Sequence, residues 1–123
     1  MPSPIISSHR RFQIWRYTVS HSQLLVRTTK TEEFPTRIDV LFKGVKEFHL
    51  PTAFDGLSIM EASDKEVLKL CDLRQLSSLY NREKVFTVQG RDFVGYVVAL
   101  VVFSHQDEGE YYDPSVFDCD PKK

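Results

Sequence analysis

At 123 residues the chain has room for one domain but is too short for two full cores, so we expect a single domain spanning residues 1–123. An apolar share of 41%, with nine phenylalanines, supports a packed core and excludes global disorder. The net charge of -1 excludes the strongly basic field that is typical of many nucleic-acid-binding proteins.

Targeting segments and cysteines bear on the cellular compartment. The first residues contain no apolar stretch of signal-peptide length, and we expect residues 1–9 to be flexible. The longest apolar run, 93–103, is about half the roughly 20 residues of a membrane helix. Cys71 and Cys119 lie in dissimilar contexts, which is typical of free thiols. The sequence therefore predicts a soluble cytoplasmic protein with free cysteines and no membrane contact.

The first half of the chain has the patterns of β-strands. Residues 11–28 read as a hairpin that turns at the polar residues 20–22. Residues 36–43 alternate, with apolar side chains on one face and charged ones on the other, broken only by Leu41. This pattern predicts a half-buried strand. A short strand at 45–50 and another at 57–61, after a turn at 54–56, complete this half.

A helix is predicted next, because Ser63 and Glu66 have the spacing of a capping box. Its apolar positions fall on two stripes that are rotated relative to each other. We therefore expect one short helical segment over residues 64–80, either kinked or in two pieces.

The last part of the chain returns to β-structure. Residues 84–89 form a strand, and the apolar run 93–105 predicts a central strand buried on both faces. Gly95 inside this run indicates a bulge or a close backbone approach. The fold class is therefore mainly β, with α+β as an alternative. We expect six to seven strands in a twisted antiparallel sheet or a two-layer sandwich, with a sheet closed on itself as the next possibility.

The C-terminal segment 106–123 is acidic and aromatic. From His105 onward the chain holds six carboxylates and two lysines, a net of -4. His105, Asp107, Glu108 and Glu110 carry donor atoms suited to divalent metals, but they lack the spacing of a calcium loop and would need further ligands from His21 or His49. A simple surface exit of the preceding strand explains the charge without a metal, so we expect no metal or cofactor.

Aromatic residues among these acids favour contact with another surface. We expect a partner to bind through the acidic aromatic residues of this segment, namely Asp107, Glu108, Glu110, Tyr111 and Tyr112. These aromatics also predict that the segment folds back on the domain or docks on a partner. The basic aromatic stretch 9–17 is the natural core of a first strand, so nucleic-acid binding is not expected.

Function is only weakly constrained by these residues. No nucleophile elbow and no phosphate-binding glycine loop occur, so the sequence does not point to catalysis. We expect a small protein-interaction module that binds another protein or itself. The alternative is a small-ligand or metal-binding domain or an enzyme, with a site near the end of the last long strand.

Overall fold

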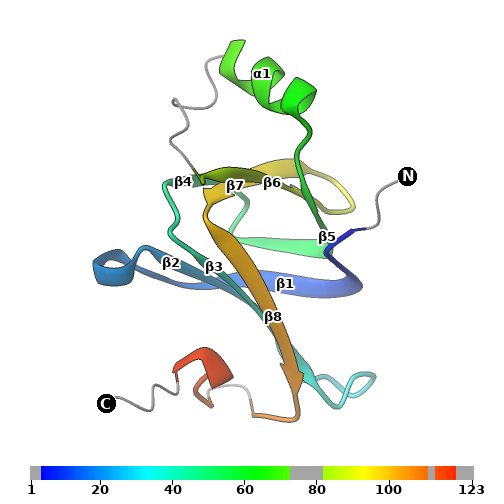
Figure 1. Cartoon of the computed structure of the whole chain (residues 1–123). Coiled ribbons are helices and arrows are strands. Elements are labelled where there is room, and N and C mark those ends of the chain that lie inside the picture. Colours follow the sequence, from blue (N-terminus) through cyan, green and yellow to red (C-terminus); the bar gives the residue numbers. More distant parts are fainter. Residues whose placement is uncertain (1–3, 73–81, 111–112, 119–123) are drawn as a thin grey trace.

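Eight β-strands make up most of the chain that the computed structural model describes, which comprises residues 4–72, 82–110 and 113–118 (Figure 1). One α-helix and two short 3-10 helices complete it. In chain order the elements are β1 (Ile6–Thr18), η1 (Val19–His21), β2 (Gln23–Thr28), β3 (Arg37–Lys43), β4 (Glu47–His49), β5 (Ala53–Glu61), α1 (Asp64–Asp72), β6 (Lys84–Gln89), β7 (Val94–Ala99), β8 (Val101–Asp107) and η2 (Val116–Asp118).

The strands form one antiparallel sheet in the order β4-β7-β6-β5-β1-β2-β3-β8. The predicted mainly β class, with an antiparallel sheet and one helix, is confirmed, and the sheet has eight strands instead of six to seven. The predicted hairpin at 11–28 is also present, because β1 and β2 pair across η1.

The sheet curls around its own core. Phe42 on β3 and Phe86 on β6 have ring centroids 6.0 Å apart, although β5, β1 and β2 lie between their strands in the sheet order. The two sides of the sheet therefore fold toward each other, as Figure 1 shows. The inner face carries a single large cluster: Phe12, Leu24, Val26, Val40, Phe42, Val45, Phe54, Leu57, Ile59, Phe86, Val88, Val97 and Ala99.

Two parts of the outer face are also covered. Val67 and Leu70 of α1 pack on a second cluster formed by Val85, Tyr96 and Val98 of β6 and β7. On β2 and β3, the outward residues Leu25 and Leu41 are buried as well. Leu25 shares its face with Arg27 and Leu41 shares its face with Arg37, and both arginines bind the Asp113 carbonyl in the C-terminal part of the chain. Figure 1 shows that part of the chain near the end of β8.

The apolar run 93–105 is two strands, which corrects the prediction of one central strand. β7 is buried, and the chain then passes through Leu100, whose N–H donates to the carbonyl of Lys43, into β8. β8 pairs with β3 alone among the described strands and lies at the edge of the sheet, with largely exposed residues. An apolar run alone does not distinguish a buried strand from an exposed edge strand.

Three local features refine the expected boundaries. Residues 54–56 belong to β5 and do not form a separate turn. Gly56 has a φ of +81° within this strand, a conformation that glycine adopts readily. β1 begins at Ile6 and pairs with β5 from that residue onward. The close approach expected at Gly95 is present, since a Cβ there would lie 2.2 Å from the carbonyl oxygen of His49.

The helix begins at its predicted capping box. The Glu66 N–H donates to the Ser63 hydroxyl at 3.2 Å, and the Ser63 N–H donates to the Glu66 carboxylate at 3.0 Å. α1 extends to Asp72, and the rest of the predicted helical range, 73–80, lies outside the described residues. Within the described ranges, no helix is long and apolar enough to cross a membrane.

Candidate functional site

The open edge of β8 is the feature of the fold most suited to binding. Seven residues of β8 pair in register with β3, from Val101 opposite Lys43 to Asp107 opposite Arg37. Among the described residues, none pairs with the other edge of β8. Alternate residues of an edge strand point their N–H and C=O groups away from the sheet, so β8 offers a row of free backbone hydrogen-bonding groups.

The side chains of β8 leave apolar surface beside this edge. Phe103 is 43% exposed and Val101 is 37% exposed, and both lie on the same face of the strand. The ammonium group of Lys43 lies 5.4 Å from the centre of the Phe103 ring. β8 contains no proline or lysine, two residue types that commonly protect an edge strand from pairing. Within the described part of the chain, the edge is thus both unpaired and largely unprotected.

A buried ion pair lies on the outer face of β2 and β3, the two strands next to β8 in the sheet. The Nε and Nη2 atoms of Arg27 donate to the two carboxylate oxygens of Asp39, at 2.6 and 3.1 Å. Both side chains are only 1% exposed. The ring of Trp15 covers the guanidinium group at 4.8 Å. The bidentate geometry offsets part of the cost of burying two charges.

A second arginine joins β3 to the end of β8. Arg37 Nε donates to the Asp107 carboxylate at 2.7 Å. This hydrogen bond is the main reason why the pKa of Asp107 lies below its ordinary value, and the Gly109 N–H contributes in the same direction against the effect of burial. The same bond raises the pKa of Arg37. The interaction with Arg37 therefore favours the ionised form of Asp107.

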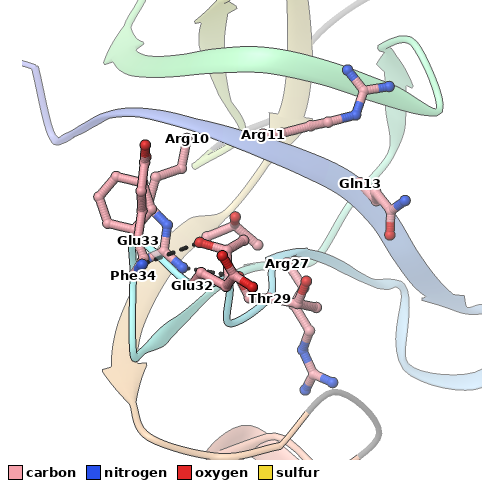
Figure 2. Close-up of a pocket in the computed structure, with 10 residues that line it drawn as sticks. Arg10, Arg11, Gln13, Arg27, Thr29, Glu32, Glu33 and Phe34 are labelled. Carbon is pink, nitrogen blue, oxygen red and sulfur yellow. Dashed lines mark hydrogen bonds between the residues drawn. The ribbon is translucent and has the colours of Figure 1, made fainter.

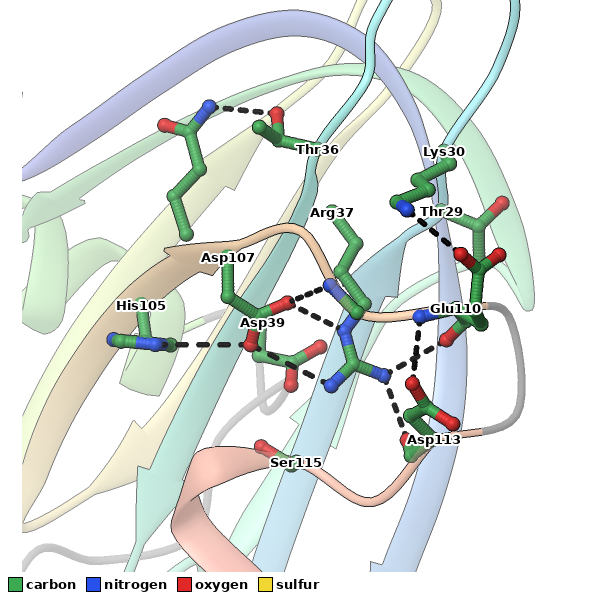
Figure 3. A network of polar contacts seen from close by, with 12 residues as sticks. Thr29, Lys30, Thr36, Arg37, Asp39, His105, Asp107, Glu110, Asp113 and Ser115 are labelled. Carbon is green, nitrogen blue, oxygen red and sulfur yellow. Dashed lines mark hydrogen bonds and ion pairs between the residues drawn. The ribbon is translucent and has the colours of Figure 1, made fainter.

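Arg37 also holds the C-terminal strap, by which we mean the described residues 108–110 and 113–118. Its guanidinium group donates to the carbonyl oxygens of Glu110, Asp113 and Pro114, and Arg27 donates to that of Asp113 (Figure 3). A Cβ at Gly109 would lie 2.5 Å from the Arg37 guanidinium carbon, so a side chain at this position would displace that guanidinium group from its partners. The two arginines thus fix the strap through its backbone.

The strap also makes packing contacts with the domain. Ser115 is fully buried, and the Phe117 ring lies 6.4 Å from the rings of Phe103 and His105. Lys30 pairs with the exposed carboxylate of Glu110 at 2.9 Å. The described part of the C-terminal segment therefore folds back on the domain, as its aromatic residues had indicated.

The residues proposed for partner or metal binding have separate environments. Asp107 is engaged by Arg37 and lies 3.6 Å from the Nε2 atom of His105, whereas Glu108 is exposed. Tyr111 and Tyr112 lie outside the described residues, as does Cys119. No three histidine, cysteine, aspartate or glutamate side chains of the described ranges gather closely enough to hold a metal ion.

A pocket of about 430 Å³ lies beside the loop between β2 and β3 and is lined by Arg10, Arg11 and Arg27 (Figure 2). Its arginines do not converge, because their guanidinium groups point in different directions. Arg10, only 8% exposed, donates to the Thr29 and Thr36 carbonyls and the Thr36 hydroxyl, and it stacks on Phe34. Burial lowers its pKa. Arg10 thus serves to hold the loop against β1.

A larger pocket of about 560 Å³ lies between α1 and the outer face of β4, β6 and β7. Tyr96 and His49 stack in it with ring centroids 6.0 Å apart. Burial, together with the nearby Glu47 carboxylate, raises the pKa of Tyr96. Glu66, the polar group that α1 contributes beside Lys69, is engaged in the capping box. The polar groups that line this pocket therefore have structural partners or belong to exposed side chains.

Sequence reasoning missed the covered outer face and the open edge. The signal for the first was present: Leu41 interrupts the alternation of β3 on the same face as Arg37 and Asp39, and all three are buried. An apolar residue within a charged face indicates that the face is covered. No comparable signal marked β8 as an edge strand.

In comparisons with known proteins, no family model, curated protein or solved structure matches this chain.

Proposed function

We propose that this chain is a protein-interaction module that binds an extended segment along the open edge of β8. The observation that carries the proposal is the seven-residue strand whose outer edge has no described partner, beside the exposed side chains of Val101 and Phe103. Strand addition uses backbone hydrogen bonds for affinity and alternate side chains for specificity. Both components are available on β8.

The acidic end of β8 is suited to selecting the partner. Glu108 follows the strand directly and is exposed, and Glu110 is exposed beside Lys30. A basic residue at the matching end of the bound segment would gain favourable electrostatic interaction, mainly through faster association and discrimination between partners. Asp107 has a different role, because its interaction with Arg37 makes it part of the fold.

The proposal is tested by comparing proteins retained from native lysate by three immobilised baits. The wild-type chain is compared with Phe103→Lys, which adds a charge at the open edge, and with Val94→Lys as a matched control. Val94 is 71% exposed, but it lies on β7, which pairs with both β4 and β6. We expect Phe103→Lys to lose the retained proteins and Val94→Lys to keep them. Equal retention by all three baits would contradict the proposal.

The contribution of the acidic end is measured separately with the double variant Glu108→Gln/Glu110→Gln. Retention should fall at low salt and differ little from wild type at about 0.5 M salt, because exposed charges are screened. Retention that is unchanged at low salt would remove the acidic end from the binding surface and leave the β8 edge as the site.

A further inference from the structure

Charge is arranged in opposite senses at the two ends of β8. Lys43 lies beside Val101 at the start of the strand, on the face that Phe103 and Asp107 share. The exposed Glu108 lies at the other end, next to Asp107, whose carboxylate is paired with Arg37. A second copy of β8 placed in parallel would bring the acidic ends together. In the antiparallel orientation, the exposed Glu108 of each copy lies toward the Lys43 end of the other copy, so this orientation is electrostatically favoured over the parallel one.

The length of the strand selects one register. Antiparallel pairing that uses all seven residues, 101–107, places Ser104 opposite Ser104 of the second copy, on a two-fold axis. Phe103 then lies opposite His105, and Val101 opposite Asp107 of the second copy. This register keeps each side chain on its own face of the combined sheet and places no two like charges opposite each other.

Building on the strand addition proposed above, we propose that β8 binds β8 of a second copy of this chain, antiparallel and centred on Ser104. The two sheets then continue into one another across the pair of edges. A contact along a single strand is small compared with stable dimer interfaces, so the dimer is weak and forms at high micromolar concentration.

The full-length chain is tested by sedimentation equilibrium from about 10 µM to 1 mM, with Ser104→Lys, Ser104→Asp and their equimolar mixture. Ser104 is exposed, so either side chain fits the monomer. On the two-fold axis each variant meets its own charge, and we expect its dissociation constant to rise at least about tenfold above that of the wild type. In the mixture the lysine faces the aspartate, and a heterodimer at least as tight as the wild-type dimer should form. The control pair Ser20→Lys and Ser20→Asp, on the exposed η1 turn, should dimerise like the wild type.

A second measurement does not depend on introduced charge. Ser104→Cys, in a chain where Cys71 and Cys119 are replaced by serine, should form a disulfide-linked dimer on mild oxidation. Residues that face each other on antiparallel strands lie within the Cα separation of a disulfide. Ser20→Cys in the same background should stay monomeric under the same conditions.

The outcomes separate this inference from the proposed function. A wild-type chain that is monomeric at 1 mM, a Ser104→Lys variant that dimerises like the wild type, or a mixture without heterodimer would overturn self-pairing. If Phe103→Lys nevertheless loses other proteins from lysate, strand addition at β8 stands and its occupant is a different chain. If Phe103→Lys loses neither its own chain nor other proteins, both proposals fail.

Discussion

On the outer face of β6 and β7, α1 rests on apolar side chains, whereas on the outer face of β2 and β3 the C-terminal strap rests on two buried arginines. Both coverings bury side chains of the same sheet. The first is held by the hydrophobic effect, which does not depend on charge. The second depends on guanidinium groups whose several fixed donors bind named carbonyl oxygens, so it can position a segment with little secondary structure of its own.

The largest effect should come from breaking the ion pair beneath the strap. Asp39→Asn leaves the Arg27 charge buried without a carboxylate, and we expect a loss of about 3–5 kcal/mol in the free energy of unfolding. Urea unfolding measures this loss. The double variant Arg27→Met/Asp39→Leu removes both charges and should be far less destabilised than the single variant. Equal losses would show that the cost is one of packing and not of unpaired charge.

Asp107→Asn should cost less, about 1.5–3 kcal/mol, because it weakens the bond to Arg37 at a partly exposed carboxylate. Its effect should also depend on pH. The pKa of Asp107 is lowered in the folded state, so its contribution is complete above the unfolded value of about 4 and is lost as pH falls through the folded value. Unfolding curves from pH 7 to pH 2 should therefore show the gap between wild type and variant narrowing below pH 4. A constant gap would contradict this assignment.

Leu70→Ala tests the apolar covering. Leu70 is half-buried against the second cluster, so we expect a loss of about 1–2 kcal/mol, below the range for a fully buried leucine. The loss should be the same at pH 7 and pH 3, because no titrating group is removed. A pH-dependent loss would show that the two coverings are coupled.

The smallest effect should come from an exposed ion pair. Arg11 and Asp55 lie 3.1 Å apart with side chains 59% and 42% exposed, and Arg11→Gln should change stability by about 0–1 kcal/mol. Thermal unfolding should show any difference between wild type and variant at low salt and a smaller one at high salt, because exposed charges are screened. A loss of stability as large as that of Asp107→Asn would mean that burial does not determine how much these ion pairs contribute to stability.

Elements defined by local chemistry could be predicted, and those defined by tertiary cover could not. The capping box of Ser63 and Glu66 and the strand predicted at residues 36–43 depend on neighbours in sequence, and both elements are present, although the strand is not half-buried as expected. Arg37 and Asp39 were placed on a half-exposed face, yet both are buried, because the strap that covers them comes about seventy residues later. The edge position of β8 has the same origin: it depends on strand order, which periodicity does not encode.

The long separation in sequence between β3 and the residues that cover it also determines the order in which these contacts can form during synthesis. β3 acquires its neighbour β8 only after residue 107 has been made, and the carbonyl groups that Arg37 binds follow later still. A chain emerging from the ribosome can form the hairpins of β1, β2 and β3 before the strap carbonyls that Arg27 and Arg37 bind have been made. The strap can therefore close only after residues 113 and 114 have been synthesised, and a product truncated before them lacks the carbonyl groups that Arg27 and Arg37 bind.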